Sequence, residues 1–257
     1  MVQGGGGTES VIYAPLFALH TKTAHALELD PREAERLEGS QEYNKVYCEA
    51  IAGYTGEATL YIGNNPESTS IREHLDFYNE YYFYDRHSIR VVKSVPIKVK
   101  RLQEVVGTDC PYDFLKLNIE GIEWDILNSL DDGFLSSVIG ICTEAQTIAM
   151  HKGSHTSDEI LQWARDHHFV LLDVQKNIFE FQIEHNLIFV KDPLFCKTKE
   201  QLIKWVMMGF LVKDADFVAY MLRLYKHRIG YDVMLQQIAK FIGIADFDAY
   251  FAKEAAG

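Results

Sequence analysis

The stretch of sequence that decides the fold covers residues 113–127 and reads DFLKLNIEGIEWDIL. Residues 112–119, at the start of this stretch, form a compact apolar run typical of a buried strand. Gly121 follows as a turn residue. From residue 123 to 130 the apolar side chains recur at helical spacing on one face. The pattern therefore predicts a strand, a tight turn and an amphipathic helix.

Signals on both sides of this stretch extend the pattern into an α/β sheet. Helices are predicted over 32–38 and, from a capping box formed by Thr156 and Glu159, to about residue 168. The alternation of strands and helices is typical of one sheet with helices on its faces. Strands are predicted over 24–29, 45–52, 56–62, 89–99, 138–144, 169–173 and 187–190, of which 56–62 and 89–99 look like an insertion beside the sheet.

After Pro193 the spacing is helical only, over residues 199–212, 216–227 and 231–242. The sequence therefore predicts an α/β domain over 1–193 and a helical extension over 194–257. Aromatic side chains recur along this extension, and we expect them in a core or at a dimer contact rather than in a substrate site; as a dimer contact they would form a homo-oligomer through these helices. They are Trp205, Phe210, Phe217, Tyr220 and Tyr225.

The charge of the chain excludes one class of partner. The 257 residues include 25 Lys and Arg against 37 Asp and Glu, a formal net charge of −12. Such a field repels phosphate backbones, so no nucleic-acid partner is expected. The four cysteines are far apart and form no C-x-x-C pair, which fits a reducing, cytoplasmic location.

Two apolar runs, 11–19 and 205–212, are short of the roughly 20 residues that a membrane-spanning helix needs. The first is expected to be a buried helix, and no membrane span is predicted.

A glycine run from Gly4 to Gly7 precedes that apolar run, and Glu28 closes the next strand about 20 residues later. Glycines allow close backbone approach, a helix start offers N–H donors, and a carboxylate at a strand end can bind a ribose diol, so a nucleotide-type ligand is expected. A flexible leader is the alternative interpretation. Because only three residues precede Gly4, the first strand is either missing or severely shortened.

The central stretch resembles the FkbM-type methyltransferases, whose fourth strand typically reads D-F-L-K-hydrophobic-D-hydrophobic-E-G-x-E. The matching positions are Lys116, Glu120, Gly121, Glu123 and Leu127. Weaker similarities extend the resemblance over about residues 4–190. They lie at 28–31, at 50–51 with Gly56, at 68–71 and at 141–144.

The resemblance implies a Rossmann-like class I S-adenosylmethionine fold with seven strands, the last antiparallel. It implies that Gly4 and Gly6 lie under the methionine part of the cofactor, that Glu28 binds the ribose and that Ala50 lies near the adenine. It also implies that Asn118 and Glu120 face the transferred methyl group, as candidate catalytic residues.

Methyl transfer to a hydroxyl requires that the acceptor lose a proton, and Glu120 is the best candidate to accept it. The alternative is that Glu120 caps the following helix while Lys116 forms an ion pair beneath it. Asn118 replaces the Asp usual in the family, and an amide can orient a hydroxyl but cannot act as a base.

Two other groups of residues are less specific. The histidines at 151, 155, 167 and 168 could hold a divalent ion with a carboxylate, but their irregular spacing favours solvated or capping roles, and no metal is expected. The aromatic run between Tyr78 and Tyr84 could stack on a sugar or anchor the insertion to the sheet.

These observations predict an S-adenosylmethionine-dependent methyltransferase that methylates a hydroxyl of a small-molecule or glycan acceptor, such as a sugar, glycan or natural product. A non-catalytic methyltransferase-like binding or scaffolding module is the alternative. A nicotinamide-dependent oxidoreductase also fits glycines and a strand-end carboxylate, but no Ser-Tyr-Lys set accompanies them.

Overall fold

The computed structural model contains two compact units, residues 1–191 and 192–257. It describes residues 2–4, 23–40, 42–75, 90–107, 112–176 and 183–211. Several predictions lie outside these residues: the helix at 11–19, the glycines at 5–7, the aromatic run at 78–84, and the helices at 216–227 and 231–242.

The main sheet has seven strands: β1 (Val2–Gly4), β2 (His25–Leu27), β3 (Lys45–Tyr47), β7 (Phe114–Leu117), β8 (Gly140–Gln146), β9 (Phe169–Lys176) and β10 (Glu184–Lys191). Their order is β3-β2-β1-β7-β8-β10-β9. The strands from β3 to β8 are parallel, and β10 runs antiparallel to both β8 and β9. The α/β class expected from the sequence is confirmed.

The first strand, β1, has three residues and lies centrally in the sheet. It pairs with β2 on one side, Gln3 opposite Ala26, and with β7 on the other, Gln3 opposite Lys116. Gly4 is its last residue. The start of the glycine run is therefore the carboxyl end of a parallel strand.

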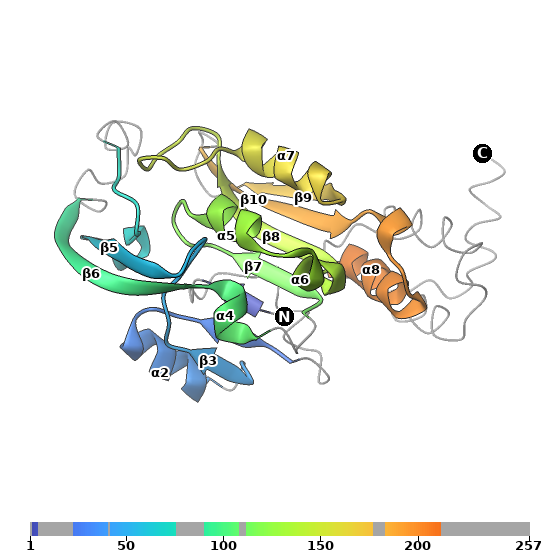
Figure 1. The fold of residues 1–257 in the computed structure, drawn as a ribbon, viewed down its shortest axis with the longest axis horizontal. Helices are drawn as coiled ribbons and strands as arrows, with labels where there is room; N and C mark the ends of the chain where they lie inside the picture. The colour runs from blue at the N-terminus through green and yellow to red at the C-terminus, as the bar shows by residue number, and fades with distance from the viewer. Residues whose placement is uncertain are drawn as a thin grey trace. The chain divides into compact units, whose positions relative to one another are not determined.

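The hydrophobic core forms around β7 and β8, in which every residue is buried. Helices α5 (Glu123–Ser129), α6 (Asp132–Ser137) and α7 (Ser157–Asp166) lie on one face of these strands (Figure 1). Ile126, Leu127 and Ile160 supply apolar side chains from α5 and α7 to this core. The strand, turn and helix expected around Gly121 are thus confirmed, and so is the capping box of α7.

One strand prediction is wrong. Residues 45–52 form not one strand but two, β3 and β4 (Ile51–Ala52), which belong to different sheets. The smaller sheet has the order β4-β6-β5, with β5 (Gly56–Gly63) antiparallel to β6 (Val91–Arg101). Figure 1 shows β6 as a long curved strand that leads directly into α4 (Leu102–Val106). At the change of sheet the Ala50 carbonyl accepts the Lys100 N–H (3.0 Å), and Ile51 and Ala52 pair with Lys100 and Arg101 of β6.

The remaining described elements of the first unit are α2 (Pro31–Gly39) and the short 3-10 helix η1 (Pro66–Ser68). The second unit begins with η2 (Pro193–Phe195) and α8 (Lys199–Leu211), within the predicted helix at 199–212. Among the helices in the described ranges, none is both long and apolar enough to cross a membrane.

Candidate active site

Five residues that the sequence singled out lie near the carboxyl ends of parallel strands, either within the strand or just after it. Gly4 ends β1, Glu28 follows β2, Ala50 comes three residues after β3, Asn118 follows β7, and Glu144 lies near the end of β8. Parallel strands place their carboxyl ends at one edge of the sheet. The chain order also reverses between β1 and β7, and ligands of open α/β sheets bind at such a point.

Glu28 is held between the ends of β2 and β3. Its N–H donates to the Tyr47 carbonyl (2.9 Å), and its Oε1 accepts the Asp30 N–H (2.9 Å). The side chain is partly buried. The carboxylate is therefore fixed at the edge of the sheet, in the place where the sequence predicted a diol-binding group.

Ala50 is 8% exposed and packs with Ala52 and Val99 beside the smaller sheet. Leu29, Ile71 and Ile97 pack against this small cluster, so the surroundings of Ala50 are apolar.

The turn between β7 and α5 is held together by Glu123. Its carboxylate accepts the Ile119 N–H (2.6 Å) and the Gly121 N–H (3.0 Å). Capping of the start of α5, which one interpretation of the sequence assigned to Glu120, is therefore the role of Glu123. Burial raises the pKa of Glu123 to about 7, against the effect of these hydrogen bonds.

Glu120 has a backbone conformation that side chains other than glycine rarely adopt, with φ of 50°. Its carbonyl accepts the Ser70 hydroxyl (2.6 Å), and within the described part of the chain no hydrogen bond reaches its carboxylate. Burial, and then the nearby carboxylates of Glu144 and Glu184, raise the pKa of Glu120 well above its ordinary value. A poorly solvated carboxylate in a strained turn is typical of a functional position.

Position 121 requires glycine because the ring of His151 lies too close to leave room for a Cβ. The φ of Gly121 is +91°, and a Cβ at this position would lie 2.6 Å from His151 Nδ1. His151 is fully buried and its ring lies 4.4 Å from that of His74. The expectation of a solvated or capping His151 is therefore wrong, and burial, then the charge of His74 and of Arg72, lower its pKa to about 3.

The other histidines of that cluster lie near the ends of α7. His155 pairs with Glu159 of the capping box (2.8 Å), His167 Nδ1 contacts the Trp163 carbonyl (2.8 Å), and His168 is exposed. Over the described residues, no group of three or more metal-binding side chains could hold an ion.

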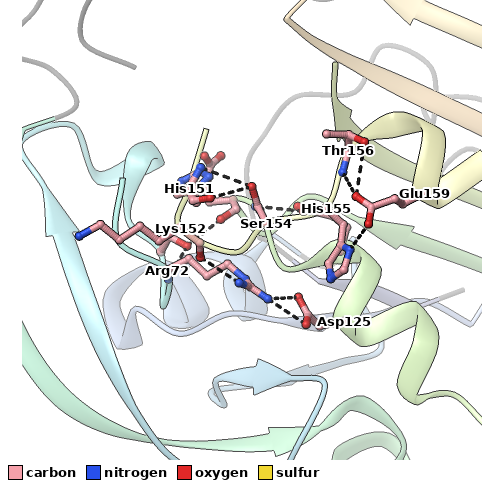
Figure 2. A network of polar contacts seen from close by, with 12 residues as sticks. Arg72, Asp125, His151, Lys152, Ser154, His155, Thr156 and Glu159 are labelled. Atoms are coloured by element: carbon pink, nitrogen blue, oxygen red, sulfur yellow. Dashed lines mark hydrogen bonds and ion pairs between the residues drawn. The ribbon is translucent and has the colours of Figure 1, made fainter. Parts of the chain in front are cut away.

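Sequence reasoning missed a segment that contacts the turn, residues 68–75, which we call the arm. Figure 2 shows its Arg72 directed at Asp125 of α5, with bonds of 2.9 and 2.7 Å, and at the Lys152 carbonyl (2.9 Å). Ser70 of the arm bonds the turn itself. The similarity of 68–71 to a serine-containing family segment was the only sequence signal for it.

The family model for the methyltransferase FkbM domain matches residues 10–171, which is more than half of the 257-residue chain. The chain belongs to the FkbM methyltransferase family. The resemblance predicted from the central stretch is thereby confirmed. The sequence therefore does not belong to the nicotinamide-dependent oxidoreductases, the other enzyme class considered above.

Solved methyltransferases are similar to this FkbM-family chain at low identity. An FkbM methyltransferase from Methylobacillus flagellatus KT is 13% identical, with a TM-score of 0.43 over 73% of this chain and 42% of that one. This chain therefore spans less than half of that protein. The magnesium protoporphyrin IX methyltransferase of Synechocystis PCC 6803, solved with bound S-adenosylmethionine, is 8% identical, with a TM-score of 0.36 over 74% and 68% of the two chains. A search of curated proteins found no match.

Proposed function

We propose that this FkbM-family chain is an S-adenosylmethionine-dependent O-methyltransferase, acting on a hydroxyl of a sugar, glycan or natural product. The observation that carries the proposal is the shared edge of the sheet. There the fixed carboxylate of Glu28 follows β2, and the strained turn that contains Glu120 follows β7.

The residues at this edge fit the cofactor chemically. Gly4 has no side chain to obstruct the strand end, Glu28 can accept hydrogen bonds from a ribose diol, and Ala50 offers an apolar surface to an adenine ring. Gly6, the other predicted cofactor-binding glycine, lies outside the described residues. Bound S-adenosylmethionine supplies an electrophilic methyl group on its sulfonium.

The protein side chains would serve the acceptor. With the cofactor bound, Glu120 would accept the proton of the acceptor hydroxyl, while the methyl group would pass from the sulfonium to the hydroxyl oxygen and S-adenosylhomocysteine would leave. A raised pKa makes the ionised Glu120 carboxylate a stronger proton acceptor. Asn118, directly after β7, orients the hydroxyl through its amide.

Calorimetric titration with S-adenosylhomocysteine tests this site without knowledge of the acceptor. We expect micromolar affinity for this ligand and none for NAD in a parallel titration. Glu28→Ala should weaken binding by about 1 to 3 kcal/mol, because ribose hydroxyls lose their partner. Glu35→Ala, which removes an exposed carboxylate of α2, is the matched control. Equal affinity of the wild type and Glu28→Ala would remove Glu28 from the site.

A non-catalytic module is the second candidate, and the observation that favours it is Asn118 where the family usually has Asp. A chain that binds S-adenosylhomocysteine but releases none from S-adenosylmethionine with any hydroxyl acceptor would support this candidate.

A further inference from the structure

The arm, residues 68–75, connects the smaller sheet with the loop that follows β8. Ser70 pairs through its backbone with Tyr61 of β5, and His74 pairs with His151. Arg72 lies between these two backbone contacts. The arm is therefore fixed at two points, with the guanidinium side chain emerging from its middle.

The Arg72 side chain joins two further segments. It forms a bidentate ion pair with Asp125 in the first turn of α5 and donates to the carbonyl of Lys152 (2.9 Å), as Figure 2 shows. The loop approaches so closely that a Cβ on Gly153 would lie 2.7 Å from Arg72 Nη1. Only 21% of the Arg72 side chain and 29% of the Asp125 side chain are exposed, so this pair is partly shielded from solvent.

A short chain of hydrogen bonds leads from Arg72 to the turn. The Arg72 N–H donates to Ser70 Oγ (3.0 Å), and the Ser70 hydroxyl donates to the Glu120 carbonyl (2.6 Å). Ser70 is 3% exposed, so water does not compete readily for its hydroxyl. The arm thus acts on the one turn residue whose carboxylate the proposed reaction uses.

The left-handed conformation of Glu120 is unfavourable for a residue with a side chain and persists only where neighbours impose it. Glu123 holds the N–H groups on either side of Glu120, and Ser70 holds the carbonyl of Glu120 itself. Without the bond from Ser70, the peptide between Glu120 and Gly121 is held only through the Gly121 N–H, and Glu120 can leave the left-handed region. Because the backbone angles of Glu120 set the direction of its Cα–Cβ bond, that change turns the Glu120 carboxylate away from its place in the turn.

We propose that Ser70 and Arg72 are positioning residues, which hold the turn so that the Glu120 carboxylate stays at the carboxyl edge of the main sheet. Arg72 places the arm through Asp125 and Lys152, and Ser70 transmits that placement to Glu120. This inference rests on the proposed function, because it assigns the pair a role through Glu120.

The test is a titration of the Glu120 carboxyl by carbon-13 NMR on the full chain labelled in its glutamates, with Glu120→Gln used for assignment. The variants are Ser70→Ala and Arg72→Lys, since lysine keeps the charge but lacks the bidentate fork. Ser129→Ala, whose hydroxyl also donates to a backbone carbonyl (2.8 Å, to Ile126), and Arg36→Lys, which pairs with Glu33 on α2, are the controls.

We expect the Glu120 titration midpoint to fall by about one pH unit or more in both variants, because the released carboxylate gains water, and to stay unchanged in both controls. An unchanged midpoint in folded Ser70→Ala and Arg72→Lys would overturn the proposal, and so would an equal shift in the controls. Affinity for S-adenosylhomocysteine, measured on the same samples, should stay within about twofold. If the wild type does not bind S-adenosylhomocysteine, the proposed function is contradicted. The NMR titration would still show whether Ser70 and Arg72 position the Glu120 carboxylate.

Discussion

At the scale of single residues, Gly121 shows how closely the turn and the loop after β8 approach each other. Gly121→Ala should destabilise the protein by about 2 to 4 kcal/mol, because alanine meets the His151 ring and also resists a φ of +91°. Chemical denaturation measures this change. Gly39→Ala is the control, since a Cβ at the end of α2 meets nothing within 4 Å, and we expect a change of no more than about 1 kcal/mol there. Equal effects at the two positions would mean that the turn can move away from His151.

The carboxyl group of Glu123 should make stability depend on pH. Its pKa is about 7 in the folded state, against an ordinary value of 4.5, so between these values the folded chain binds more protons than the unfolded chain. Stability contributed by this group is therefore greatest below about pH 4.5 and falls as the pH rises toward 7, by about 1.4 kcal/mol per pH unit in this window. The raised pKa of Glu120 acts in the same direction.

Urea denaturation at pH 5 and pH 7.5 checks this expectation. Glu123→Gln cannot titrate, so its loss of stability between the two pH values should be smaller than that of the wild type. Glu35→Gln, at an exposed position of α2, should behave like the wild type. A pH dependence that survives unchanged in Glu123→Gln would show that this carboxyl ionises normally in the folded protein.

At the scale of elements, the capping box of α7 shows a local signal that the structure follows. The Glu159 carboxylate accepts the Thr156 N–H (2.8 Å), and the Thr156 side chain accepts from the Glu159 backbone. Thr156→Ala should cost about 1 kcal/mol of stability, measured by thermal or chemical denaturation. Thr156→Ser keeps the hydroxyl and should cost less. Equal losses in the two variants would point to packing of the threonine methyl group as the cause.

The elements that could be predicted are those whose signals lie within a few residues. The apolar run before Gly121 predicts a strand, and Thr156 with Glu159 predicts a helix start. The structure confirms both elements. The division of residues 45–52 between two sheets could not be predicted, because it depends on Lys100, 50 residues from its partner Ala50. The burial of His151 likewise depends on His74, and the fixation of Glu120 depends on Ser70.

At the scale of the whole molecule, the net charge of −12 should affect the binding of S-adenosylmethionine more than the binding of S-adenosylhomocysteine. S-adenosylmethionine carries one more positive charge than S-adenosylhomocysteine, so the field of the protein attracts it more strongly. Raising sodium chloride from 20 to 500 mM should therefore weaken S-adenosylmethionine binding about two- to fivefold more than S-adenosylhomocysteine binding, measured by calorimetry. Equal salt dependence of the two ligands would mean that the field at the site is not negative.

The short β1 has a consequence for how the sheet opens. Three residue pairs on each side of β1 connect β2 to β7, and β2 and β3 also share three. On the other side of the sheet β7 and β8 share four pairs, and β8 and β10 share seven. Cooperative unfolding units divide where such connections are fewest. Native-state hydrogen exchange should therefore separate two populations of amides, with those of β2 and β3 exchanging through a lower-energy opening than those of β7 and β8. The proposed cofactor site spans this boundary, so a bound cofactor would slow exchange most on the weaker side.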